Sequence, residues 1–180
     1  MLYRLAVETG LRSSELSSLT RASFQLDGDD PCVIVAAAYS KHRREDRQPI
    51  RPEVVLLLRT YLANKTPAAR AFPMPPSDRV SRMFKQDTDR ASIVHRDVSG
   101  RVVDFHALRH TFISNLVSGG VYPKVAQQLA RHSTVKLTLD RYTHTFQGEL
   151  KTALNRLPNL TSTEPVKNGA TGNANLPQAG

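Results

Sequence analysis

Residues 105–116 read Phe-His-Ala-Leu-Arg-His-Thr-Phe-Ile-Ser-Asn-Leu, and this stretch decides much of the fold. Its apolar residues recur three and four positions apart, which predicts a helix with one face in a core. Gly119 and Gly120 follow and predict where the helix ends. His106 and Arg109 are three positions apart, so both are expected on one helix face. Taken alone, this pair is more typical of a solvated helix face than of a binding site.

Further helices are predicted on the C-terminal side. Pro123–Ala130 and Val135–Arg141 have helical patterns, and Arg131-His132-Ser133 joins them. A last helix is predicted over Phe146–Leu154. Its apolar stripe, which needs a partner surface, consists of Phe146, Leu150, Leu154 and Leu157. Packing within the same domain and docking on another copy of the chain both remain open.

A short helix that ends at a glycine is predicted at the N-terminus. Residues 2–9 place apolar side chains on one face, and Gly10 ends the helix. Ser13 or Ser14 is expected to cap the next helix.

A small antiparallel sheet is predicted next. The expected strands contain Phe24 and Leu26, then Cys32–Ala38, then a short edge strand that begins with Gln48-Pro49-Ile50. Residues 27–31 and the basic stretch Lys41–Arg47 are the expected turns. Helices are expected at 52–63 and 78–86, with a proline-rich loop between them. The fold class expected is therefore mainly α with a small three-stranded antiparallel β-sheet (α+β).

Composition narrows the class of partner. The 180 residues suffice for one domain with a core, and the net charge is +9 with an isoelectric point near 10.1. This charge favours a polyanionic partner, although a basic surface without any partner would have the same charge. The single cysteine, Cys32, cannot form an internal disulfide, so a reducing, cytoplasmic setting is predicted. No apolar stretch approaches the ~18 residues of a membrane span, so no membrane partner is expected.

Several residues could bind and attack a phosphodiester. Cutting DNA without a metal needs a nucleophile, an acid for the leaving oxygen, and cations for the charge that builds on phosphorus. Arginine suits the last task because its planar fork binds two phosphate oxygens and stays protonated. Candidates for such a site are Arg12, His106, Arg109, His132 and Tyr142.

A metal site is not expected. His106 and His110 are four positions apart, which is the spacing of two zinc ligands on a helix. No glutamate follows His106, however, so the metalloprotease motif His-Glu-x-x-His is not formed.

The order of these residues and the sequences that flank them resemble the catalytic domain of the tyrosine recombinases, the phage integrase family. Residues 9–16, Thr-Gly-Leu-Arg-Ser-Ser-Glu-Leu, are similar to the box of the family's first arginine, and residues 106–112 to its His-x-x-Arg box. Residues 129–132 are similar to its Leu-Gly-His, with Arg131 where the glycine usually stands. Residues 140–144, Asp-Arg-Tyr-Thr-His, match its nucleophile box.

The resemblance implies a transesterification that needs neither metal nor ATP, and therefore no cofactor. Tyr142 would attack a DNA phosphate and stay joined to the 3′ phosphate, which frees a 5′ hydroxyl. Arg12, Arg109 and His132 would stabilise the pentacovalent phosphorus. His106 would assist proton removal from the tyrosine or hold the phosphate.

The lysine and glutamate of the site are also implied by the resemblance. Lys41 begins a run that is similar to the family's lysine-bearing β-hairpin, where it would protonate the departing 5′ oxygen. Arg43 and Arg44 stand where many members have a glycine, which alters the expected turn. Glu15 would hold the guanidinium of Arg12; an ordinary surface ion pair is the alternative.

The resemblance implies a catalytic domain over residues 1–157, followed by a disordered polar tail over residues 158–180. The family's N-terminal core-binding domain is expected to be absent. The implied partners are double-stranded DNA and other recombinase protomers on it, with a monomer expected without DNA, and the implied setting is a mobile element. Two alternatives stay open: a truncated, non-catalytic DNA-binding remnant, and an enzyme like the type IB topoisomerases.

Overall fold

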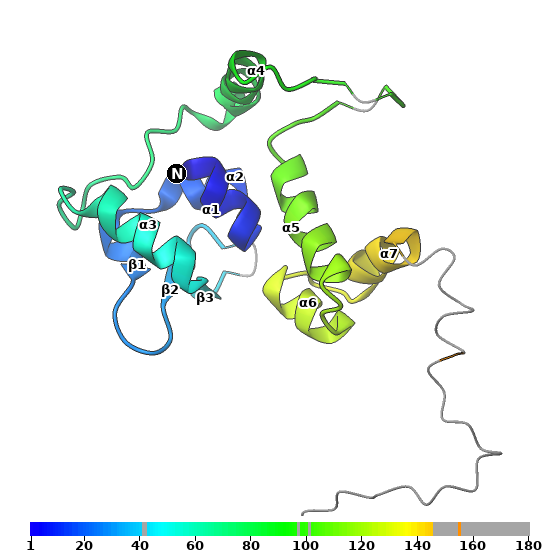
Figure 1. Cartoon of the computed structure of the whole chain (residues 1–180). Coiled ribbons are helices and arrows are strands. Elements are labelled where there is room, and N and C mark those ends of the chain that lie inside the picture. Colours follow the sequence, from blue (N-terminus) through cyan, green and yellow to red (C-terminus); the bar gives the residue numbers. More distant parts are fainter. Residues whose placement is uncertain (41–42, 97, 101, 146–154, 156–180) are drawn as a thin grey trace, which may run out of the picture. The chain divides into compact units, whose positions relative to one another are not determined.

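Short helices make up most of the structure (Figure 1). The computed structural model describes residues 1–40, 43–96, 98–100, 102–145 and 155, and its elements lie within one compact unit, Met1–Phe146. The helices are α1 (Leu2–Thr9), α2 (Ser13–Ser18), α3 (Pro52–Leu62), α4 (Val80–Arg90), α5 (Ala107–Ser118), α6 (Pro123–Leu129) and α7 (Lys136–Thr145). The strands are β1 (Phe24–Gln25), β2 (Cys32–Val35) and β3 (Asp46–Pro49), with 3₁₀ turns η1 (Arg21–Ser23) and η2 (Ser77–Arg79). The predicted fold class is confirmed.

Gly10 ends α1, as predicted, and lets α1 pack closely on α5. Its φ of 62° lies in the left-handed region, and its N–H donates to the Ala6 carbonyl at 2.9 Å. A Cβ atom at this position would meet the Phe112 ring at 2.4 Å. Glycine allows both the left-handed backbone and the close approach to Phe112, so the chain that follows α1 begins beside α5.

The start of α2 differs from the prediction. Arg12, rather than Ser13 or Ser14, is the residue that precedes the helix, and its backbone is extended. The Glu15 carboxylate accepts the Arg12 backbone N–H at 2.7 Å, which is one half of a capping box. The Glu15 carboxylate thus secures the backbone of the residue that precedes the helix, which is a different hydrogen bond from the one expected of a capping serine.

The sheet has the order β1-β2-β3 and is antiparallel throughout. Pro49 pairs with Cys32 and lies on an edge strand, as predicted. The predicted strand ends are shifted: β2 stops at Val35 because the chain turns there, with the Ser40 N–H donating to the Ala36 carbonyl at 3.1 Å. The third strand begins two residues earlier than expected, so it includes Asp46 and Arg47 in place of the predicted turn.

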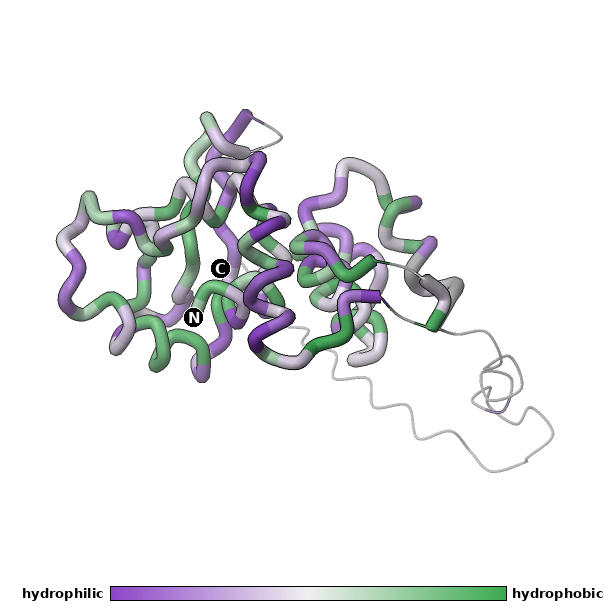
Figure 2. Tube along the Cα trace, turned by 90° about the horizontal axis from the view of Figure 1, so that it is seen from above, coloured by the Kyte–Doolittle hydropathy of each residue, from purple (hydrophilic) through white to green (hydrophobic). Residues whose placement is uncertain are grey.

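Two groups of buried apolar residues hold these elements together. Figure 2 shows how apolar and polar residues alternate along the helices. The larger group joins α1–α4 to the sheet and includes Leu5, Leu16, Leu19, Val33, Val54, Leu58, Leu62 and Phe72. The smaller group comprises Phe112, Ile113, Val117 and Ala130, with Leu116, Leu129 and Tyr142 packed on it. Burying each large side chain contributes about 1.5–3 kcal/mol. Cys32 lies in β2, within the strand predicted for it, and is buried there.

The remaining helices predicted within the described residues are present with small shifts in their ends. Helix α4 spans Val80–Arg90 instead of 78–86, since η2 occupies the first positions. The predicted helix at 146–154, its apolar stripe and the predicted tail at 158–180 lie outside the described residues. Within the part of the chain that the structure describes, no helix is both long and apolar enough to cross a membrane.

Candidate active site

Arg12 is held at the start of α2 by a buried carboxylate. Its Nη1 lies 2.9 Å from Oε1 of Glu15, which is only 1% exposed. The pair is therefore far less solvated than the surface ion pair that the sequence left open. Burial alone would raise the pKa of Glu15, but Arg131 and Arg12 outweigh it and the pKa is lowered. Glu15 thus stays charged and fixes the Arg12 guanidinium.

Arg109 is a buried cation on α5. Its Nη1 donates to the Gly10 carbonyl and its Nη2 to the Ala130 carbonyl, so it joins the end of α1 to the end of α6. Burial, followed by the charges of Arg12 and Arg131, lowers its pKa to about 10. The guanidinium still carries its proton at neutral pH, and the two carbonyls orient it.

His132 follows α6 and is half-buried. Its Nδ1 lies 3.0 Å from Oγ1 of Thr138, a fully buried residue of α7. Burial, followed by the charges of Arg109 and Arg12, lowers the pKa of His132 to about 4. The ring is therefore uncharged at neutral pH.

His106 lies where α5 begins, close to both arginines. Its ring meets that of His110 edge to face, with centroids 4.7 Å apart. A pocket of about 200 Å³ is lined by Arg12, His106 and Arg109, together with Phe105 and the first residues of α2. Both histidines lie close enough to His132 to lower its pKa as well. The structure thus brings together four of the predicted site residues.

Tyr142 is placed differently. Its ring packs on the smaller apolar group, and its hydroxyl donates to the carbonyl of Val121, in the loop between α5 and α6. Burial raises the pKa of this hydroxyl. Tyr142 is not among the described residues that line the pocket of Arg12 and Arg109.

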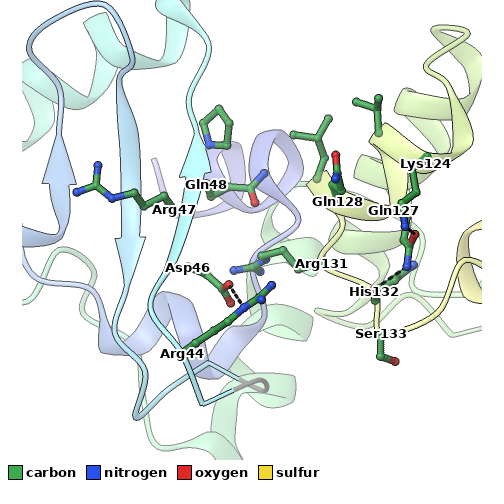
Figure 3. A pocket seen from close by; sticks show the side chains of 13 residues that line it. Arg44, Asp46, Arg47, Gln48, Lys124, Gln127, Gln128, Arg131, His132 and Ser133 are labelled. Atoms are coloured by element: carbon green, nitrogen blue, oxygen red, sulfur yellow. Dashed lines mark hydrogen bonds and ion pairs between the residues drawn. The ribbon is translucent and has the colours of Figure 1, made fainter.

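A larger hollow of about 750 Å³ lies between β3 and α6, and we call it the β3–α6 groove (Figure 3). Its charged lining residues are Arg44, Asp46, Arg47, Lys124 and Arg131, with His132 beside them. Figure 3 shows Arg44 paired with Asp46, at 3.4 Å between Nε and Oδ1. Because the cations outnumber the single carboxylate, the groove suits an anionic partner.

Lys41, the predicted acid, lies outside the described residues, so its place is not part of this geometry. Among the residues that are described, no three His, Cys, Asp or Glu side chains come together in a way that could hold a metal ion.

Two residues of the site were not predicted. Arg131 has a φ of 51°, and its Nη2 lies 2.7 Å from Oε2 of Glu15. The sequence carried one signal for it, an arginine where glycine usually precedes the histidine. Because the backbone at this position is left-handed, glycine is the residue that fits it without strain, which accounts for the glycine usual in the family. Thr138 gave no signal, because a threonine within a helix has no special spacing.

Comparisons with known proteins show the family of the chain. Residues 1–149 match the sequence model of the phage integrase family. The chain belongs to this family. Tyrosine recombinase XerC of Pelobacter propionicus is 26% identical over 138 residues, which are 76% of this chain and 44% of the relative. Tyrosine recombinase XerD of Rickettsia conorii is 27% identical over 169 residues, or 87% of this chain and 55% of the relative. The chain thus spans about half the length of these curated relatives.

Solved structures show the same fold. The Tn1549 transposon integrase in complex with transposon right end DNA superposes with a TM-score of 0.63 at 21% identity, over 86% of this chain and 57% of the integrase. The catalytic domain of bacteriophage HP1 integrase gives a TM-score of 0.58 at 24% identity, over 87% of this chain and 80% of that domain. The fold of this family member is therefore that of the tyrosine recombinase catalytic domains.

Proposed function

We propose that this chain cleaves and rejoins DNA strands as the catalytic part of a site-specific tyrosine recombinase. The observation that carries the proposal is the meeting of Arg12, Arg109 and His106 at one pocket, although they come from distant parts of the sequence. Arginine forks bind phosphate oxygens in pairs, and a pocket with two of them suits a phosphodiester. Their carboxylate and carbonyl partners orient both guanidiniums before any DNA binds, which is the arrangement that stabilises developing charge.

His132 enters this mechanism as a neutral hydrogen-bond donor. With its proton on Nε2, the ring would accept the Thr138 hydroxyl at Nδ1 and donate its N–H to a nonbridging phosphate oxygen. A neutral donor next to two arginines avoids adding a third repelling cation. A bound phosphate would relieve that repulsion and raise the pKa of the ring.

Tyr142 is the proposed nucleophile. Its oxygen attacks phosphorus, the bond from phosphorus to the 5′ oxygen breaks, and the chain is joined to the 3′ phosphate. The Val121 carbonyl now accepts the hydroxyl, so the oxygen must leave this partner before it attacks. His106 would assist proton removal or hold the phosphate, and Lys41 would protonate the departing 5′ oxygen.

The proposed partners and setting follow from the reaction. Double-stranded DNA and further protomers assembled on it are the partners, with a monomer in the absence of DNA and no cofactor. Support comes from the basic lining of the β3–α6 groove and from the integrase relative that was solved with transposon DNA. A catalytic domain over residues 1–157, a disordered tail after it, a cytoplasmic location and a mobile-element host remain part of this proposal.

The reaction can be tested with a suicide substrate, a DNA duplex nicked beside the cleavage site so that the cut strand diffuses away. Since the target sequence is not fixed by the chain, the substrate is drawn from the ends of the element that encodes it. We expect a covalent protein–DNA adduct that forms in EDTA and without ATP, because the chemistry is carried by side chains. Tight binding without an adduct would contradict the proposal and favour the non-catalytic remnant. Relaxation of supercoiled plasmid without strand exchange would favour the topoisomerase alternative.

A further inference from the structure

Arg131 is almost completely buried although it lines the β3–α6 groove. Its Nη2 lies 2.7 Å from Oε2 of Glu15, while Nη1 of Arg12 lies 2.9 Å from Oε1 of the same carboxylate. One buried carboxylate therefore links an arginine at the start of α2 to an arginine at the end of α6 (Figure 3 shows Arg131 beside the groove).

The backbone of Arg131 is as informative as its side chain. Its φ of 51° lies in the left-handed region, where a residue with a Cβ atom is strained. This conformation reverses the chain after α6, with the Arg131 N–H donating to the Gln128 carbonyl at 2.9 Å and the His132 N–H to the Gln127 carbonyl at 3.1 Å. The direction in which His132 leaves the helix thus depends on this one residue.

We propose that Arg131 is a positioning residue for the DNA cleavage reaction, tying the turn that carries His132 to the carboxylate that holds Arg12. This inference rests on the proposed function. Without Arg131, Oε2 of the buried Glu15 would lose its ionic partner, and a buried carboxylate that loses half of its compensation is costly. Arg12 and His132 would then be free to shift relative to each other, and small displacements of catalytic groups slow a reaction strongly.

Three arginines face Glu15 from the elements packed around it. They are Arg12 at the start of α2, Arg131 after α6, and Arg109 on α5, whose pKa is lowered mainly by burial while this carboxylate acts in the opposite direction. Burial acts to raise the pKa of Glu15, and the charge of Arg131 is the foremost influence that lowers it. Removing Arg131 should therefore raise the pKa of Glu15.

Arg131→Gly separates the two roles of this residue. Glycine adopts the left-handed backbone without strain, so the turn is kept while the ion pair is lost. Arg131→Lys keeps a positive charge that can reach Glu15. Ser92→Gly is the matched control, because Ser92 is an exposed residue with a φ of 56° that lies outside the candidate site.

The first measurement follows the Glu15 carboxyl by ¹³C NMR titration of the full chain, with Glu15→Gln used to assign its signal. We expect a titration shifted to higher pH in Arg131→Gly, a return toward the wild-type titration in Arg131→Lys, and no change in Ser92→Gly. An unchanged Glu15 titration in Arg131→Gly would overturn the inference.

The second measurement follows adduct formation on the suicide substrate as a function of pH. In Arg131→Gly we expect a rate lower by up to about a hundredfold, the order of loss when catalytic groups are displaced by about 1 Å, and an acid limb moved to higher pH. Arg131→Lys should recover much of the rate, and Ser92→Gly should match the wild type. A merely structural turn would be satisfied by glycine, so a wild-type rate and pH profile in Arg131→Gly would contradict a positioning role. A wild-type chain that forms no adduct would contradict the proposed function, whereas the titration still decides the link between Arg131 and Glu15.

Discussion

The charge of each site residue follows from its immediate neighbours. Glu15 is buried but stays ionised because two guanidiniums share it, and Arg109 stays protonated although burial and two like charges lower its pKa to about 10. Burial and the charges of Arg109 and Arg12 lower the pKa of His132 to about 4, and its Nδ1 faces the Thr138 hydroxyl. The site therefore holds fixed cations beside a neutral imidazole.

The low pKa of His132 predicts a particular loss of stability in acid. The ordinary value is 6.5 and the folded value about 4, so between these pH values the unfolded chain binds more protons at this residue. Stability from this residue is thus complete above pH 6.5 and is lost as the pH falls towards 4. We expect a contribution of about 1 kcal/mol, because solvent screens a half-exposed ring.

NMR titration of the His132 ring protons and urea unfolding between pH 7 and 4 test this prediction. His132→Gln should show a weaker loss of stability over this range than the wild type, since glutamine does not titrate. A His132 midpoint near 6.5 in the folded chain would contradict it.

The ends of the helices position the site. The turn at Gly10 delivers Arg12 to α5, the start of α5 carries His106, and the end of α6 carries Arg131 and His132. Each catalytic candidate of this group therefore depends on how a helix begins or ends, rather than on the middle of a helix face. Substitutions at these ends should disturb the site more than their exposure suggests.

Gly10→Ala tests the close approach of α1 to α5 at Gly10 and Phe112. The new Cβ atom would meet the Phe112 ring at 2.4 Å at a left-handed φ of 62°. Backbone strain and overpacking together should lower the free energy of unfolding by about 2–4 kcal/mol. Gly28→Ala is the matched control, because Gly28 also has a positive φ, 88°, but no atom within 4 Å of the added carbon.

Urea unfolding of the two variants distinguishes these effects. The control should lose about 1–2 kcal/mol, from backbone strain alone. Equal losses in both variants would show that the contact between Gly10 and Phe112 does not limit the packing of α1 on α5.

The sequence predicted the elements better than their ends. Helical spacing was enough for α5, and Pro49 correctly marked an edge strand. The predicted cap of α2 was wrong. A serine at a suitable position could not reveal that Arg12 would precede the helix, with its backbone N–H bound by the Glu15 carboxylate. The proximity of Arg12 and Arg109 could be expected only from the resemblance, since no local pattern encodes a contact across so many residues. The Tyr142–Val121 contact and the Glu15–Arg131 pair are tertiary, and nothing in the spacing predicted them.

The net charge of +9 is consistent with a chain that binds a polyanion. Several of the positively charged side chains line the β3–α6 groove. Contacts between Lys or Arg and DNA phosphates release counterions, so affinity for duplex DNA should fall steeply with salt. Replacing a groove cation should remove about one phosphate contact and flatten this dependence.

Arg47→Gln and Lys124→Gln should each reduce the slope of log K against log salt by about 1. Arg59→Gln is the control, because Arg59 pairs with Asp27 at 3.0 Å and does not line the groove. Fluorescence anisotropy with a labelled duplex over a salt series gives the slopes. An affinity that does not change with salt would argue against a phosphate-binding surface.

The most direct test of the proposed chemistry is to identify the residue that becomes joined to DNA. The wild-type adduct is trapped on the suicide substrate, digested with protease and analysed by mass spectrometry. We expect the DNA-linked peptide to carry the modification on Tyr142, and Tyr142→Phe to form no adduct while binding DNA nearly as well as the wild type. Tyr122→Phe, which alters a tyrosine 73% exposed to solvent, should form the adduct normally. An adduct that persists in Tyr142→Phe, or that maps to Tyr122, would contradict the assignment of Tyr142 as the nucleophile.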